Sequence, residues 1–182
     1  MSALTQSPWI LHYDASSCNG CDIETLACLT PLFDVERLGV LNTGNPKHAD
    51  IFLVTGAVNE QCRSVIQTLY AQMPEPKVVV AVGTCACSGG IFRECYNVAG
   101  GIDGVIPVDV YVPGCAARPE AIIDGVVAAI GILESKHQAR RAPPQEAAVQ
   151  AAPAPPPKEA EAEALPRRKP VFQNVPVAAE KK

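Results

Sequence analysis

The chain has 182 residues, of which 48% are hydrophobic, and a formal net charge of −4. This length and composition suffice for one domain with a sizeable core. The charge is uneven, because residues 1–138 carry −7 and residues 139–182 carry +3. An acidic body argues against nucleic acid as the main partner.

The N-terminal residues and the number of cysteines indicate in which cellular compartment the protein is expected. The first residues lack a basic segment followed by an apolar one, so no secretory signal peptide is expected. The most apolar helical stretch, residues 121–133, is too short to span a bilayer and contains Asp124. Eight cysteines in such a chain indicate metal or redox work before disulfides. We therefore expect a protein of the cytoplasm, where thiols stay reduced.

Short apolar or β-branched runs alternate with helical patterns along residues 1–138. Most of these runs lack polar alternation, as expected for strands buried on both faces of a parallel sheet. The predicted strands are 9–13, 38–41, 51–55, 78–82 and 105–112. The predicted helices run from Asp22 to before Pro31, from an Asn59 cap to about Met73, and from Pro119 through Leu133. This pattern predicts a three-layer α/β fold around an open, mostly parallel sheet of flavodoxin-like strand order.

Residues 139–182 differ in composition from the predicted domain. They contain nine of the 17 prolines and a single aromatic residue, Phe172. Such a segment buries too little apolar area to fold alone, so we predict a Pro/Ala-rich charged tail that is largely disordered. Both a solubilising tail and a segment that docks on a partner through residues 167–175 fit this composition.

Four cysteines follow the ends of predicted strands. Cys18 and Cys21 form a C-x-x-C after the first strand, Cys85 follows 78–82, and Cys115 follows 105–112. Loops at the carboxyl ends of parallel strands meet at one edge of a sheet. Four thiolates there are a ligand set for one iron–sulfur cluster, in a protein that conducts electrons. Zinc is the alternative, although zinc sites are usually built from two C-x-x-C pairs and only one is present.

The remaining cysteines have a simpler interpretation. Cys87 competes with Cys85, which we prefer because it comes first after the strand. Cys28, Cys62 and Cys95 fit the ordinary fate of a free cysteine, a small hydrophobic side chain or a plain thiol.

Glu24 and the histidines are the other candidate polar residues. Glu24 is either an acid favoured by the dipole in the first turn of a helix, or a carboxylate beside the cluster that moves protons; the sequence favours the first. His12, His48 and His137 are expected to be structural. No phosphate-binding glycine motif is present in the sequence, so nucleotide binding has no support.

Several motifs together resemble one protein family. They are Cys18-Asn-Gly-Cys21-Asp-Ile-Glu24, Gly83-Thr-Cys85-Ala-Cys-Ser-Gly-Gly90, Tyr96-Asn-Val-Ala-Gly-Gly-Ile102, Val112-Pro-Gly-Cys115 and the stretch from Gly44 to Gly56. They resemble the small subunit of energy-converting, membrane-associated nickel–iron hydrogenases, most closely the Ech type. These small subunits are homologous to the complex I subunit that holds the terminal cluster. The resemblance covers roughly residues 8–135.

The resemblance implies one 4Fe–4S cluster ligated by Cys18, Cys21, Cys85 and Cys115, and thus Cys85 over Cys87. The complex I subunit has adjacent cysteines where this chain has C-x-x-C, which favours the hydrogenase branch. The family's carboxylate after the first cysteine pair matches Glu24. This chain departs from the family in having Ala116-Ala117 where two prolines often follow the last cysteine, and the tail has no counterpart.

A nickel–iron centre in this family needs two C-x-x-C pairs, so hydrogen chemistry would belong to a large subunit. The resemblance implies a subunit that relays electrons between a ferredoxin-like 4Fe–4S subunit and the nickel–iron centre of the hydrogenase large subunit. The complex would depend on ferredoxin, contain integral membrane ion-translocating subunits, and place this chain peripherally on the cytoplasmic side of the cell membrane. The alternatives are a complex I-like quinone oxidoreductase subunit and a zinc-stabilised interaction module.

Overall fold

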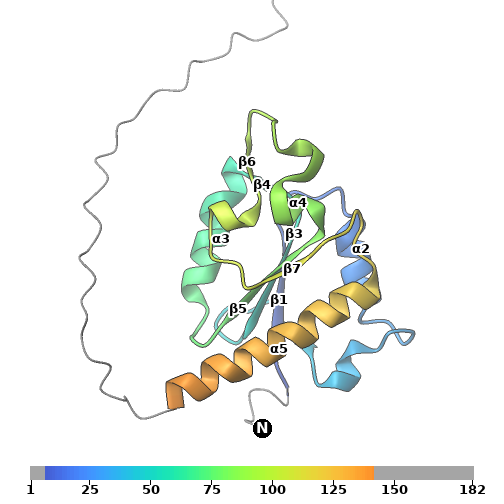
Figure 1. Ribbon diagram of the computed structural model, residues 1–182, viewed down its shortest axis with the longest axis vertical. Helices are drawn as coiled ribbons and strands as arrows, with labels where there is room; N and C mark the ends of the chain where they lie inside the picture. Colours follow the sequence, from blue (N-terminus) through green and yellow to red (C-terminus); the bar gives the residue numbers. More distant parts are fainter. Residues whose placement is uncertain (1–6, 142–182) are drawn as a thin grey trace, which may run out of the picture. The chain divides into compact units, whose positions relative to one another are not determined.

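The computed structural model describes residues 7–141, and a five-stranded sheet forms the centre of this part of the chain (Figure 1). The strands are β1 (Trp9–Asp14), β2 (Leu41–Asn42), β3 (Ile51–Thr55), β5 (Val78–Val82) and β7 (Val110–Val112). All their pairings are parallel, in the order β2-β1-β3-β5-β7. The order reverses once, between β1 and β3, which is the flavodoxin-like arrangement. The predicted α/β fold is confirmed.

Helices connect the strands and cover the sheet. They are α2 (Gly20–Ala27), α3 (Glu60–Gln72), α4 (Gly83–Ser88) and α5 (Pro119–Arg141), with 3₁₀ turns at Val35–Leu38, Gly90–Phe92 and Ile102–Gly104. A separate antiparallel pair joins β4 (Val58–Asn59) to β6 (Val98–Gly100). Asn59 caps α3 as predicted, because its side chain accepts a hydrogen bond of 2.7 Å from the Cys62 amide.

Two apolar cores lie on the two faces of the sheet. Along β3, Ile51 and Leu53 pack with α5 on one face, whereas Phe52 and Val54 pack with α3 on the other. The same alternation continues along β5. Since neighbouring residues of a strand point to opposite faces, a continuous apolar run serves both cores. Figure 1 shows α5 on one side of the sheet and α3 on the other.

Two predicted strands are shorter than expected. The run 38–41 forms the end of a 3₁₀ turn and only the first residue of β2, because Gly39 adopts a left-handed φ of 82° between them. The run 105–112 pairs only over β7, since Pro107 has no N–H to donate to a strand ladder. Ile106 is nevertheless buried and packs in the α3-side core.

Helix boundaries also differ from the prediction. The first helix begins at Gly20, two residues before Asp22, and ends at Ala27. The last helix continues to Arg141, and most of the predicted tail, residues 142–182, lies outside the described residues. Within residues 7–141, no helix combines the length and the apolar character needed to cross a bilayer.

Gly125 sets the closest approach of α5 to the edge strand β7. A Cβ atom at this position would lie 2.4 Å from Cγ2 of Val112. Val112 is buried and β-branched, so its methyl group cannot easily turn away. The lack of a side chain at Gly125 therefore lets the helix pack directly on the strand that precedes Cys115.

We predict that Gly125→Ala lowers the free energy of unfolding by about 1–3 kcal/mol through overpacking. Gly131→Ala is the matched control in the same helix, because a Cβ there meets nothing within 4 Å. Its better helix propensity should raise stability by up to about 1 kcal/mol. Urea unfolding of the full chain measures both, and equal effects of the two variants would contradict the close contact.

Candidate functional site

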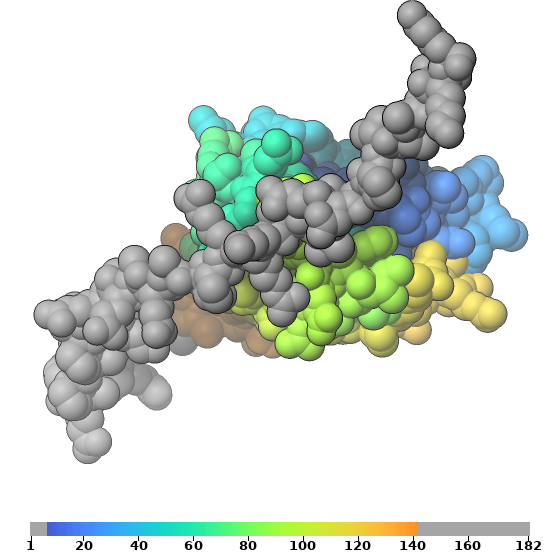
Figure 2. All heavy atoms as spheres, turned by 90° about the horizontal axis from the view of Figure 1, so that it is seen from above, coloured from blue at the N-terminus to red at the C-terminus, as the bar shows by residue number. Residues whose placement is uncertain are grey.

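The four predicted cysteines lie beyond the carboxyl ends of three parallel strands. Cys18 is in the loop after β1, Cys21 in the first turn of α2, Cys85 in α4 directly after β5, and Cys115 in the loop after β7. The expectation that these loops meet at one edge of the sheet is confirmed. In Figure 2, seen from above, these segments appear in blue, green and yellow.

The thiols are close enough to influence one another's ionisation. Burial raises the pKa of Cys21, and the negative charges of Asp22, Cys18 and Cys115 raise it further. Burial likewise raises the pKa of Cys85, with added contributions from Cys115, Cys18 and Cys21. Cys18 and Cys115 are exposed, whereas Cys21 and Cys85 are partly buried. These mutual effects place the four thiols in one neighbourhood near the surface of the domain, and Cys87 lies next to it, since Cys21 and Cys85 also raise the pKa of Cys87 after burial.

Backbone contacts connect the cysteine segments. The Thr84 amide and hydroxyl donate to the Gly114 carbonyl at 2.9 and 3.1 Å, which joins α4 to the loop of Cys115. The backbone N–H of Ala117 lowers the pKa of Cys21, which opposes the effect of burial. Ala117 is fully buried. A proline at this position, as the resembling family often has, has no backbone N–H to do so.

Two glycines leave room beside the sulfurs. A Cβ at Gly83 would lie 2.4 Å from the Cys21 sulfur, and a Cβ at Gly90 would lie 3.3 Å from the Cys85 sulfur. Both glycines have positive φ angles, of 85° and 54°. Cys18 also lines a hollow of about 190 Å³ together with Phe92 and Val98. The chain thus keeps bulk away from three of the four thiols.

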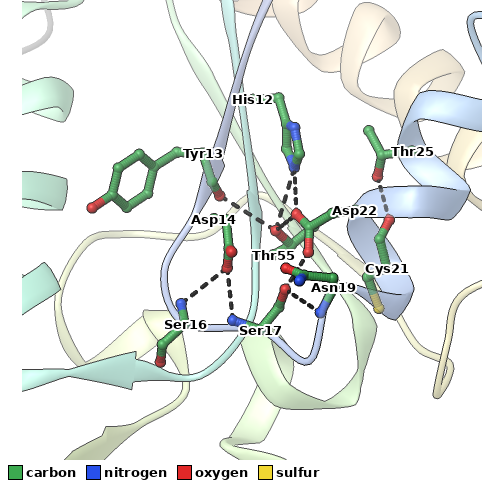
Figure 3. A network of polar contacts seen from close by, with 10 residues as sticks. All are labelled: His12, Tyr13, Asp14, Ser16, Ser17, Asn19, Cys21, Asp22, Thr25 and Thr55. Carbon is green, nitrogen blue, oxygen red and sulfur yellow. Dashed lines mark hydrogen bonds and ion pairs between the residues drawn. The ribbon is translucent and has the colours of Figure 1, made fainter.

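Hydrogen bonds to acidic side chains shape the loop that carries Cys18 (Figure 3). Oδ1 of Asp14 accepts hydrogen bonds from the amides of Ser16 and Ser17, at 3.0 and 2.7 Å. The Ser16 hydroxyl donates to the Ala57 carbonyl at 2.6 Å. The Ala15 amide donates to the Thr55 carbonyl at 2.9 Å. The loop is therefore tied both to its own strand and to the turn after β3.

Asp22 is the centre of a second set of contacts (Figure 3). Its carboxylate accepts hydrogen bonds from the hydroxyls of Ser17 and Thr55, the latter at 2.5 Å. Nε2 of His12 lies 3.0 Å from Oδ1 of Asp22. Burial raises the pKa of Asp22, but these hydrogen bonds and the nearby His12 outweigh it and hold the pKa below its usual range. The sequence indicates only an acid at a helix start and a structural histidine, because no local pattern records their contact.

The other cysteines take different environments. The Cys87 thiol donates to the carbonyls of Ala81 and Val112, at 3.6 and 3.8 Å. Burial raises the pKa of Cys28 to about 11, and its thiol donates to the carbonyls of Glu24 and Pro119. Glu24 itself is half-buried on α2.

The two remaining thiols lie on different elements. Cys62 is on α3, and burial and a hydrogen bond with Cys62 raise the pKa of Tyr13 to about 12. Cys95 is exposed in the segment before β6.

The donor set determines which ions this group of thiols could hold. Thiolates are soft ligands that select zinc or iron–sulfur clusters over magnesium or calcium. Among residues 7–141, no three His, Cys, Asp or Glu side chains lie close enough together to hold a single ion as they stand. A cluster places iron and sulfide between its ligands, so its thiolates stand farther apart than those of one ion. The thiolate donor set fits a cluster, and the absence of side chains at Gly83 and Gly90 lets the sulfurs of Cys21 and Cys85 lie close to the backbone there.

Comparisons with known proteins agree with this architecture. A "Probable membrane-bound hydrogenase subunit mbhJ" of Pyrococcus furiosus is 49% identical over 141 residues, which cover 78% of this chain and 84% of the relative. A subunit of the NADH-quinone oxidoreductase of Geobacter metallireducens is 49% identical over 107 residues, covering 59% of this chain and 62% of the relative. Among solved structures, a chain of the membrane-bound sulfane sulfur reductase, an archaeal respiratory membrane complex, is 38% identical, with a TM-score of 0.64 over 73% of each chain.

These relatives are subunits of oxidoreductase complexes. Residues 18–129 match the family described as "NADH ubiquinone oxidoreductase, 20 Kd subunit". The match begins at Cys18 and contains Cys21, Cys85 and Cys115. It spans more than half of the chain, which therefore belongs to this 20 Kd family of oxidoreductase subunits.

Proposed function

We propose that this chain is the electron-transfer subunit of a membrane-associated nickel–iron hydrogenase complex, with one 4Fe–4S cluster held by Cys18, Cys21, Cys85 and Cys115. The observation that carries the proposal is the single group of four thiols from three strand ends, with glycines beside two of the sulfurs. The similarity to a membrane-bound hydrogenase subunit supports the type of complex. When bound, such a cluster accepts and releases one electron at a time.

The residues around the thiols have separate tasks in this proposal. Cys21 in α2 and Cys85 in α4 are partly buried and would hold the cluster on the side of the domain. Cys18 and Cys115 are exposed and present the outer side to a partner. Large exposed apolar side chains at Ile91, 89% exposed, and Tyr96, 103% exposed, support a partner surface nearby.

The proposed electron transfer requires a partner on each side of the cluster. The nickel–iron centre lies on a hydrogenase large subunit, and a ferredoxin-like 4Fe–4S subunit exchanges electrons with the other side. Integral membrane ion-translocating subunits complete a ferredoxin-dependent complex, and this chain is peripheral on the cytoplasmic side of the membrane. The similarity to a membrane-bound hydrogenase subunit supports this assembly.

A serine substitution tests the ligand set within one short helix. Cys85→Ser should remove most iron and acid-labile sulfide and abolish hydrogen evolution from reduced ferredoxin by the purified complex. Cys87→Ser is the matched control, since a serine hydroxyl can still donate to the carbonyls of Ala81 and Val112. Iron and sulfide analysis with low-temperature EPR measures both variants. Full iron content in Cys85→Ser, or its loss only in Cys87→Ser, would reject this ligand set.

The same preparation separates the alternatives. Nickel in the purified complex, with hydrogen evolution, selects the hydrogenase. Quinone reduction without nickel selects the complex I-type subunit, which the NADH–quinone relative supports. Zinc without iron or sulfide selects the interaction module.

A proline at residue 117 tests the amide donor to Cys21. Because a hydrogen bond to a ligand sulfur stabilises the reduced, more negative cluster, Ala117→Pro should shift the midpoint potential to more negative values. Ala116→Pro places the same ring at an exposed neighbouring residue and serves as control. An EPR redox titration of the full chain measures both, and an unchanged potential in Ala117→Pro would exclude this role.

Glu24 is proposed to transfer protons beside the site. It follows Cys21 by three residues and so lies on the same side of α2. Glu24→Gln should slow hydrogen evolution by the complex and leave its iron content unchanged. Wild-type rates in this variant would leave Glu24 as a helix-start acid only.

A further inference from the structure

The C-x-x-C turn is held by one carboxylate that belongs to neither strand it contacts. Asp22 follows Cys21 directly and lies in the first turn of α2. Its side chain is only 13% exposed, and it meets groups from three places: Ser17 in the loop, Thr55 on β3 and His12 on β1 (Figure 3). One side chain therefore links the turn to two adjacent strands of the sheet.

The contact with Ser17 sets the backbone around Cys18. The Ser17 hydroxyl donates to Asp22, which leaves the lone pairs of its oxygen to accept the Asn19 amide at 2.9 Å. Asn19 takes a left-handed φ of 66°, which reverses the chain between the two cysteines. Without Asp22, the Ser17 hydroxyl loses the acceptor that orients it, and the turn loses this closure.

The contact between Asp22 and Thr55 attaches the turn to a residue that cannot move, at the end of β3. Thr55 ends β3 and is fully buried, so its hydroxyl cannot follow a moving loop. A hydrogen bond to a charged group is stronger than a typical neutral one. The position of the first cysteine pair is thus determined by a charged contact with the sheet interior.

We propose that Asp22 is a positioning residue, which holds the turn from Cys18 to Cys21 in the conformation that binds the cluster and keeps a carboxylate beside Cys21. The inference rests on the proposed function, since it requires the cluster. Groups that orient metal ligands typically cost about 10–100-fold in metal affinity when they are removed. A negative charge next to a ligand also favours the oxidised cluster, which carries less negative charge.

The test compares Asp22→Asn with the wild type in the full chain, purified without oxygen. Asn keeps the size of the side chain but removes its charge. We expect iron release to a chelator to be about 10–100-fold faster. We also expect altered EPR g values and a more positive midpoint potential, which a purely structural role would not change. Asp34→Asn is the control, because it removes an equal charge from an exposed ion pair with Arg37.

A double-mutant cycle identifies the contact. Ser17→Ala removes one donor to Asp22, so we expect faster iron release than the wild type. The effect of the double variant should be smaller than the two single effects combined, because both changes weaken the same contact. If Asp22→Asn does not fold, Ser17→Ala decides: faster iron release supports the inference, and wild-type release overturns it.

Two further outcomes overturn the inference. The first is wild-type iron release and potential in Asp22→Asn. The second is a lower urea midpoint with unchanged EPR and potential in the folded protein, which would make Asp22 structural only. If Cys85→Ser loses its iron while Asp22→Asn retains it, only this inference fails. If the wild-type chain holds no iron and sulfide, the proposed function itself fails.

Discussion

The parallel pairing of β1, β3, β5 and β7 is the constraint on which the rest of the structure depends. Because the strands run in one direction, the loops after β1, β5 and β7 all leave from the same edge of the sheet. Cysteines that are separated by 63 and 29 intervening residues in the chain are thereby brought to one edge of the sheet. An antiparallel arrangement of these strands would send some of these loops to the opposite edge.

Collecting four thiols at one edge has an electrostatic cost that the surrounding residues offset. Thiolates repel one another, and burial and that repulsion raise the pKa of Cys21 and Cys85. The opposing contribution at Cys21 is the Ala117 N–H, which favours the charged sulfur. In the proposed function, iron would supply the larger share of compensation, since a coordinated thiol is deprotonated. The hydrogen bonds within the loop between β1 and α2 give the turn that carries Cys18 its shape without any bound metal.

The contacts made by Asp14 and Asp22 connect this site to the interior of the domain. Asp14 accepts two backbone amides of the loop, and Asp22 links the same loop to Thr55 inside the sheet. A shift of the α2 start relative to β3 would therefore move Cys18 and Cys21 together. We infer that the rigidity of the proposed ligand pair comes from these acid-to-loop contacts more than from the helix propensity of α2, which has only eight residues.

The α/β class, the apolar strands β1, β3 and β5, the Asn59 cap and the four strand-end cysteines could all be predicted from the residues alone. These features are local, since each depends on a run of residues or a spacing that can be read directly along the chain. Folding in three dimensions was needed to place the tight packing at Gly125 and the convergence of Ser17, Thr55 and His12 on Asp22. These depend on distances between segments far apart in the chain, which no local pattern records.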